Sequence, residues 1–245
     1  MFLGDKFMQR KKNIIIMIIS ILMISIIGFT FYHYQSLKKK ENLSLKTSLV
    51  TKQNEISKSL KTTGYTIDNP KIILDPYEAS PLTALVLFET EEEVSPKVII
   101  KGKDKLTTIE TEFAKNTKHY LPIYGLYPDY NNKVEISYTL KNGKEVIKEI
   151  EIKTKALPDD FVLPTSVKKD SSKLSNDLYF FTPSSKGYTC AYDVNGDVRW
   201  YLSNNAIWDN TRLKNGHMMV STERLVNSPY YMTGLYEIDL LGHIY

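Results

Sequence analysis

Four histidines are the side chains of this sequence best suited to nucleophilic attack or to binding a transition metal near neutral pH. They are His33, His119, His217 and His243. No two of them have the three- or four-residue spacing that places both imidazoles on one face of a helix. The histidines therefore predict no metal site, and each must be weighed as a single side chain.

The neighbours of each histidine in the sequence favour structural roles. His33 follows a long apolar run and is expected at a membrane boundary, while His119 lies in a strand-like segment, where it is structural or exposed. His217 follows an Asn-Gly turn, from which its imidazole could contact a substrate, although a structural position in a sheet is the more common outcome. His243 follows Gly242 at another turn and is expected to face solvent.

One acidic segment has the alternation of a calcium-binding loop. Asp193, Asn195 and Asp197 alternate, but the glycine stands at position 196, and Asn204 occupies the place where such a loop needs a bidentate glutamate. An Asn-Gly hairpin turn explains the same residues without a metal. The sequence therefore favours a turn, and no metal or other cofactor is predicted.

Aromatic side chains near the C-terminal end could stack on an aromatic ligand, but packing between sheets is their more common role. They are Trp200, Tyr201, Trp208, Tyr230 and Tyr231. The single cysteine, Cys190, excludes an internal disulfide and a cysteine zinc cluster, and its apolar segment predicts a buried, unreactive thiol. No Gly-rich phosphate loop and no Gly-x-Ser-x-Gly motif occurs. We therefore assign no catalytic residue, and the substrate-binding residues stay undefined.

The composition is that of a globular protein with a preference for β-structure. Of the 245 residues, 42% are hydrophobic and 24% are charged, and 17 are tyrosines. The net charge is +4, but lysines in the strand-like segments alternate with glutamates, which is typical of a solvated face. This pattern argues against a nucleic-acid partner.

The first forty residues have the pattern of a membrane anchor. A basic tail, residues 1–12, precedes a predicted transmembrane segment, residues 13–34, whose central residues 14–31 carry no charge. As a helix, those eighteen residues would span about 27 Å. A cleaved signal peptide is the alternative, but the apolar run is long for one and no small-residue cleavage site follows it. We expect an uncleaved, single-pass anchor in the cell membrane, with the bulk of the chain outside the cytoplasm, periplasmic or extracellular.

The next segments predict a spacer and then a β-sandwich. The spacer, residues 35–67, is expected to be partly helical, because its apolar residues fit one stripe of a helix. In residues 68–156, seven short apolar segments recur at roughly ten-residue spacing, which is typical of an immunoglobulin-like sandwich. Part of this region resembles the E–F corner of a fibronectin type III module, except that Asn132 stands where a tyrosine is expected. Residues 157–177, rich in Pro, Ser, Asp and Lys, are predicted to be a linker.

An internal repeat marks residues 178–245. Residues 192–198 align with residues 238–244, and in each copy an aspartate precedes a glycine by three positions. A period of 40 to 50 residues with hairpins inside it is typical of a β-propeller blade, with two unrelated hairpins as the alternative. Because a propeller closes with about four or more blades, we expect residues 178–245 to be the incomplete start of one, in a chain that is the front part of a longer protein.

Four sequence blocks together resemble a known family. They are LDPYEASPLTALVLFET, PIYGLYPDYNNKV, GDVRWYL and TGLYEIDLLGHIY, which follow one another between Ile73 and the last residue. In this order they resemble the amino-terminal third of bacterial aryl-sulfate sulfotransferases, which pair a small β-sandwich domain with a β-propeller. The sequence departs from that family at Glu78, where glycine is usual, and at Pro128, where a small residue is usual.

The resemblance implies transfer of a sulfuryl group from a phenolic sulfate ester to a phenol through a sulfated histidine, without a nucleotide sulfate donor. In the family, the reactive groups line the propeller channel and come from later blades. We therefore expect the full-length protein to be a transferase, and this chain alone to be an inactive amino-terminal fragment that lacks the catalytic histidine. The alternative is a membrane-anchored, extracytoplasmic binding module without catalysis. The sequence defines neither the individual phenols nor the oligomeric state.

Overall fold

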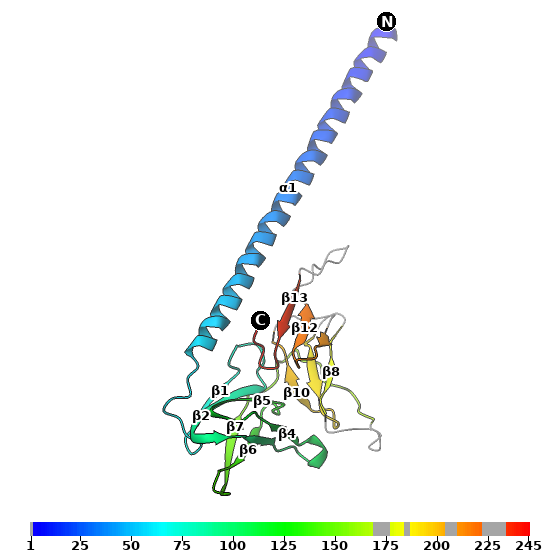
Figure 1. The fold of residues 1–245 in the computed structure, drawn as a ribbon. Helices are drawn as coiled ribbons and strands as arrows, with labels where there is room; N and C mark the ends of the chain where they lie inside the picture. Colours follow the sequence, from blue (N-terminus) through cyan, green and yellow to red (C-terminus); the bar gives the residue numbers. More distant parts are fainter. Residues whose placement is uncertain (1, 169–176, 184–186, 204–209, 222–233) are drawn as a thin grey trace. The chain divides into compact units, whose positions relative to one another are not determined.

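The computed structural model describes residues 2–168, 177–183, 187–203, 210–221 and 234–245; within its helix, it describes the side chains of residues 11–38 and of those from 49 onward. Figure 1 shows one long helix at the N-terminus and many short strands after it. Two compact units make up the chain, Met1–Asn54 and Glu55–Tyr245. The protein is mainly β, as the sequence predicted.

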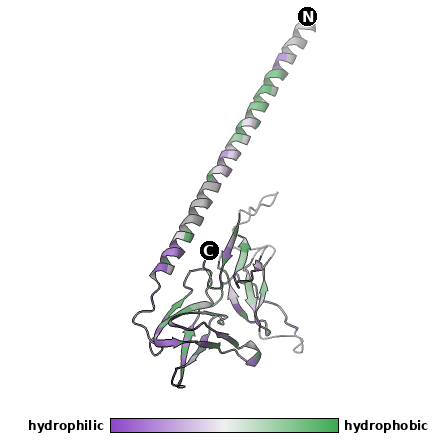
Figure 2. Ribbon diagram, in the orientation of Figure 1, coloured by the Kyte–Doolittle hydropathy of each residue, from purple (hydrophilic) through white to green (hydrophobic). Residues whose placement is uncertain are grey.

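Helix α1 (Phe2–Ser59) contains the predicted membrane segment and continues through most of the predicted spacer. Its stretch Lys11–Lys38, much of which is coloured hydrophobic in Figure 2, is long and apolar enough to cross a membrane. Three hydroxyls in this stretch donate to backbone carbonyls one turn earlier, from Ser20, Ser25 and Thr30, each at 2.9 Å. These polar groups are satisfied within the helix, as a hydrocarbon surrounding requires. The helix could therefore anchor the chain in a membrane.

Each of the seven apolar segments predicted in residues 68–156 contains a strand. The strands are β1 (Lys71–Leu74), β2 (Thr83–Val94), β3 (Lys97–Ile100), β4 (Ile109–Glu112), β5 (Asn116–Tyr124), β6 (Asn131–Thr139) and β7 (Glu145–Lys153). All pair antiparallel, in one sheet of order β1-β2-β5 and another of order β4-β3-β6-β7. The hairpin between β6 and β7 turns at Asn142-Gly143, where the sequence predicted it.

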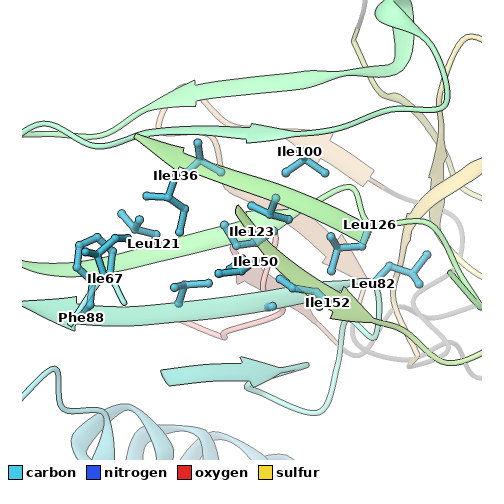
Figure 3. Close-up of a cluster of buried hydrophobic side chains, with 14 of the residues drawn as sticks. Ile67, Leu82, Phe88, Ile100, Leu121, Ile123, Leu126, Ile136, Ile150 and Ile152 are labelled. Carbon is cyan, nitrogen blue, oxygen red and sulfur yellow. The ribbon is translucent and has the colours of Figure 1, made fainter. Parts of the chain in front are cut away.

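Alternation along the strands places one face of each sheet in a shared core. In β6, Asn132, Val134, Ile136 and Tyr138 are buried, and the residues between them are more exposed. Figure 3 shows apolar side chains of the two sheets meeting between their strands. Full burial of one isoleucine or phenylalanine contributes about 1.5–3 kcal/mol, so this layer is the main source of the sandwich's stability.

The outer face of the four-stranded sheet carries the alternating lysines and glutamates. Lys97 lies 2.7 Å from Glu110 on the neighbouring strand, and Lys101 lies 2.8 Å from Glu149 and 3.1 Å from Glu135. All of these side chains are at least partly exposed, so the pairs add little to stability. The face is solvated and paired, as the charge pattern indicated.

One predicted strand begins later than expected. The sequence placed residues 106–113 in a strand, but Lys105–Thr107 form a 3₁₀ turn and β4 starts at Ile109. The carboxylate of Asp104 accepts the amides of Leu106 and Thr107, and the Thr107 hydroxyl accepts the Asp104 amide. This reciprocal cap satisfies backbone groups that a strand would have paired with a neighbour.

Asn132 fastens the corner where the sequence lacks the expected tyrosine. Its amide oxygen accepts the Tyr127 amide at 2.8 Å, and its nitrogen donates to the carbonyls of Tyr127 at 3.0 Å and Ile152 at 3.3 Å. The side chain is fully buried. One asparagine thus holds the loop before β6 against the end of β7, because it offers a donor and an acceptor together.

The C-terminal part forms two three-stranded antiparallel sheets. The strands are β8 (Tyr179–Phe181), β9 (Cys190–Tyr192), β10 (Val198–Tyr201), β11 (Asn210–Arg212), β12 (Met218–Ser221) and β13 (Leu235–Ile238). The sheet orders are β10-β9-β8 and β11-β12-β13. No closed barrel or ring of sheets occurs among the described residues.

The sequence repeat is also a repeat of turn geometry. The Asp193 amide donates to Asp197 and the Gly196 amide donates back to Asp193, and the turn Asp239–His243 has the same two bonds. Gly196 and Gly242 have φ of +82° and +85°, which glycine adopts without strain. The two copies are therefore equivalent hairpin turns, each beginning with an aspartate.

We expect Asn132→Ala to destabilise the sandwich. The buried Tyr127 amide loses its only hydrogen-bond partner among the described residues, and an unsatisfied buried donor costs about 1–3 kcal/mol. Urea unfolding of the chain in detergent, followed by far-UV circular dichroism, measures the loss. The matched control is Asn131→Ala, which removes only an exposed bond to Glu151 and should change stability by less than about 0.5 kcal/mol. Equal effects of the two substitutions would contradict the role of Asn132.

Candidate functional site

A buried arginine forms the most polar interior site of the described residues. Arg199 on β10 has no exposed surface, although it lies between Val198 and Trp200 in a strand buried throughout. The register of β10 against β9 shifts between Val198 and Trp200, so Arg199 falls at a bulge. A bulge turns a side chain away from the simple alternation, and here it directs the guanidinium toward the sandwich.

The guanidinium of Arg199 is held by backbone carbonyls of the sandwich. Its Nε donates to the Gly125 carbonyl at 2.6 Å, and its Nη1 donates to the Thr107 carbonyl at 2.8 Å. The Nη1 also lies 3.0 Å from the Tyr127 hydroxyl and 3.1 Å from an oxygen of Asp193. These five residues, the arginine network, join β10 and its hairpin turn to two loops of the sandwich.

Within the network the positive charge of Arg199 is paired with the negative charge of Asp193, and nearly every polar atom has a hydrogen-bond partner. Arg199 and Asp193 are both buried, which would be costly for either ion without the other. The Tyr127 hydroxyl donates to Asp193, and burial raises the pKa of this phenol, so it stays protonated as a donor. One nitrogen, Nη2 of Arg199, has no partner among the described residues. The arginine is permanently charged and has no solvent access, so the network fits a role in positioning, with no role in proton transfer.

The aspartate of the supposed calcium loop belongs to this network. One oxygen of Asp193 accepts the amides of Asn195 and Asp197, and the other accepts Tyr127 and Arg199. All of these contacts fit the hairpin-turn interpretation. The carboxylate holds the turn with one oxygen and the arginine with the other.

Gly125, whose carbonyl accepts Arg199, occupies a position that leaves no room for a side chain. Its φ is +88°, and a Cβ placed there would lie 2.5 Å from a methyl carbon of Ile109. The residue lies in the block PIYGLYPDYNNKV, and Arg199 lies in the block GDVRWYL. The sequence did not predict a contact between these two blocks, because a charged residue in a strand usually faces solvent.

Two of the four histidines, His33 and His119, do not line either described cavity. His33 is exposed on α1. His119 is buried on β5, where its ring stacks on Phe88 and its Nε2 lies 2.9 Å from the Thr90 hydroxyl. Burial lowers the pKa of His119, so the ring is neutral inside the sandwich. It is structural, one of the two outcomes expected for it.

The other two histidines lie near each other, on either side of one tyrosine. His217 stacks on Tyr245 with ring centres 4.4 Å apart, and its Nδ1 lies 2.8 Å from Glu237. The prediction that His243 faces solvent is wrong: its half-buried ring stacks on Tyr77 and contacts the edge of Tyr245. The turn that carries His243 packs against the sandwich, which the sequence alone did not indicate.

The described aromatic candidates pack within the protein. Trp200 is fully buried, lies against Phe180, and donates from its indole to the Leu240 carbonyl at 2.7 Å. Tyr201 contacts Tyr188, and burial raises the pKa of Tyr201 to about 12. Trp208, Tyr230 and Tyr231 lie outside the described residues.

The single cysteine and two cavities are the remaining features that could take part in binding or chemistry. Cys190 is buried, and burial raises the pKa of its thiol, which fits an unreactive side chain. A cavity of about 910 Å³ is lined by residues that include Tyr124, Phe180, Asn210 and Arg212, and a second one of about 410 Å³ lies beside Tyr127. No histidine lines either cavity.

We expect Arg199→Met to destabilise the chain strongly, because it leaves the Asp193 carboxylate buried without its cation. Breaking a buried pair in this way costs about 3–5 kcal/mol. Arg212→Met, on an exposed position, is the matched control and should change stability by less than about 0.5 kcal/mol. Urea unfolding of both variants in detergent measures the difference.

The pair itself is tested by adding Asp193→Asn to Arg199→Met. The asparagine keeps an oxygen for the turn amides and removes the unpaired charge, so the double variant should be more stable than Arg199→Met alone. A double variant that loses the sum of the two single losses would show that the two side chains do not act as a pair.

Comparison with known proteins gives consistent matches along the chain. A model described as the arylsulfotransferase Ig-like domain matches residues 71–155, and one described as arylsulfotransferase (ASST) matches residues 164–245. Arylsulfate sulfotransferase AssT of Lelliottia amnigena is 25% identical over 224 residues, and that of Escherichia coli O6:H1 is 24% identical over 225 residues. Each alignment covers 71% of this chain and 37% of the relative.

The two models follow each other in order and together cover well over half of the chain. The first coincides with the seven-stranded sandwich, and the second contains both C-terminal sheets and Arg199. The chain spans little more than a third of the length of the curated relatives it matches. The sequence, the sandwich and these matches agree, and the chain belongs to the arylsulfotransferase family.

Proposed function

We propose that this chain is the amino-terminal portion of a membrane-anchored aryl-sulfate sulfotransferase. The observation that carries the proposal is the consecutive match of two family models to residues 71–155 and 164–245. The relatives are named arylsulfate sulfotransferases, so the substrates proposed for the whole protein are a phenolic sulfate ester as donor and a phenol as acceptor.

In this proposal the two C-terminal sheets are the first blades of a β-propeller. Their repeated aspartate turns and the bond from Trp200 to the Leu240 carbonyl support the idea, because the bond joins one sheet to the turn after the other. Blades of a propeller bury their faces against their neighbours in this way. The sandwich then holds the first sheet through the arginine network.

The proposed chemistry is a two-step transfer through a histidine. A neutral imidazole nitrogen attacks sulfur, the bond from sulfur to the phenolic oxygen breaks, and the donor leaves as a phenolate that takes up a proton. In the second step the hydroxyl of the acceptor phenol attacks the same sulfur, its proton is lost, and the sulfur–nitrogen bond breaks. Such an imidazole has to face a cavity together with donors for the sulfuryl oxygens.

None of the four histidines of this chain meets that requirement in the described residues. His33 lies in the apolar helix, His119 is buried, and His217 and His243 face Tyr245, while the two described cavities lack a histidine. We therefore place the reactive histidine of the whole protein outside residues 1–245. This chain alone is expected not to carry out the transfer.

The activity is tested with nitrophenyl sulfate as donor and phenol as acceptor. The purified chain should release no more nitrophenol than a heat-denatured sample, while the product of the complete gene should release it at an enzymatic rate. Turnover by residues 1–245 that is lost in a single His→Asn variant would overturn the placement of the reactive histidine. A complete product that folds and releases no nitrophenol would favour the binding-module alternative.

The membrane anchor is part of the proposal and has its own test. The chain should stay with the membranes during alkaline carbonate extraction, whereas a variant without residues 1–34 should be released. Protease added to cells whose outer envelope has been permeabilised, so that it reaches the outer face of the cytoplasmic membrane, should digest residues 55–245 and spare a cytoplasmic marker. Protection of these residues from the protease would contradict the proposed orientation, and a mature chain that begins after residue 34 would show that the anchor is cleaved.

A further inference from the structure

A cluster of rings and hydroxyls connects the last turn of the described chain to the sandwich and to the end of α1. The cluster, here called the clasp, consists of Ser57, Tyr77, His217, His243 and Tyr245. The His243 ring stacks on Tyr77 at 4.5 Å between centres, and its Nε2 lies 3.3 Å from the Ser57 hydroxyl. The Ser57 hydroxyl is also 3.1 Å from that of Tyr77.

The clasp closes over an apolar patch. Leu241, in the same turn as His243, packs with Leu85 and Leu87 of β2. Ile56, in the last turn of α1, and Leu60, just after the helix, pack against this cluster. This explains why β2 is buried on both of its faces: Val86 and its neighbours on that face enter the sandwich core, whereas Leu85 and Leu87 face the turn. The turn thus covers the outer face of the three-stranded sheet.

The approach of the turn to the sandwich is close. A Cβ on Gly242 would lie 2.6 Å from the Ala79 side chain, and Gly242 has φ of +85°. The Leu240 carbonyl, two residues before Gly242, accepts the indole of Trp200. A movement of this turn therefore changes the surroundings of a buried tryptophan, which provides an optical signal.

The charged and titratable groups around His243 come from four segments. Tyr77 faces it from the loop after β1, Asp239 belongs to its own turn, and Tyr245 follows that turn. His217, in the turn before β12, lies on the far side of Tyr245 and is paired with Glu237 of β13. Burial lowers the pKa of His243 below its ordinary 6.5; Asp239 opposes this and His217 adds to it. Burial also raises the pKa of Tyr77, so this phenol stays neutral.

We propose that the clasp is a pH-sensitive contact that stays closed while His243 is neutral and opens when His243 takes up a proton. Opening separates the turn Asp239–His243 from the Tyr77 ring and from Ser57. The end of α1 and the outer face of β2 then lose their cover, while the sandwich core and the arginine network stay intact.

The direction of the pH effect follows from the folded and open states. In the open state His243 has its ordinary pKa, which is higher than in the closed state, so the open state binds more protons as the pH falls. The closed state is therefore fully favoured above pH 6.5 and loses stability as the pH falls below that value. Acidification opens the clasp and return to neutral pH closes it.

The experiment follows Trp200 fluorescence in the full chain in detergent, with Trp208→Phe so that Trp200 is the only tryptophan. Between pH 8 and pH 5 the emission should shift reversibly to longer wavelength, with a midpoint below 6.5 and with unchanged far-UV circular dichroism. Absence of a shift, or a shift that occurs only together with loss of the circular dichroism signal, would overturn the proposal.

Substitutions identify the group that titrates. His243→Gln should abolish the shift, and His119→Gln, which removes the other buried histidine, should leave it unchanged. His217→Gln should move the midpoint to higher pH, because it removes the neighbour that lowers the pKa of His243. If His243→Gln does not fold, His217→Gln decides: a higher midpoint supports the clasp, and an unchanged or lower one contradicts it.

Discussion

The buried pair of Arg199 and Asp193 is the constraint on which the arrangement of residues 55–245 depends. A guanidinium without solvent is tolerable only where acceptors surround it, and two of its acceptors are backbone carbonyls of the sandwich, at Gly125 and Thr107. The sheet of β8 to β10 therefore cannot satisfy its own central charge. Conversely, the Tyr127 hydroxyl finds its acceptor, Asp193, and the Thr107 carbonyl finds its donor, Arg199, only when this sheet is present. The sandwich and the first C-terminal sheet are thus expected to fold together.

A second contact, on the outer face of β2, complements the arginine network. There the turn Asp239–His243 covers Leu85 and Leu87, so the sandwich touches the C-terminal part through a charged, buried site and through an apolar site closed by a histidine. The two contacts differ in their response to pH, because an arginine keeps its charge and a histidine does not. The sandwich of this chain thus contacts the C-terminal sheets at two separate places.

Much of this fold could be predicted from local patterns, and the failures occur where distant segments meet. Short apolar segments at roughly ten-residue spacing predicted the seven sandwich strands, and Asn-Gly or Asp-x-x-Gly turns predicted the hairpins, since both depend on residues close in sequence. Arg199 was missed because a bulge reverses the expected direction of its side chain. His243 was wrongly predicted to face solvent because hairpin turns are usually exposed. The turn that carries it is covered by the sandwich, a contact between segments far apart in the sequence. The unbroken apolar run of β2 could have indicated this contact. A strand that is apolar on both faces needs a second segment to cover its outer face, in addition to the sandwich core.

Native-state hydrogen exchange of the full chain tests the central claim most directly, because it measures the opening free energy of each segment. The amides of β9 and β10 should exchange with the same free energy as those of β6 and β7, and the two sets should fall together as urea is added. Exchange of β9 and β10 at much lower free energy, while β6 and β7 stay protected, would show that the sheet opens independently and that the arginine network does not unite it with the sandwich.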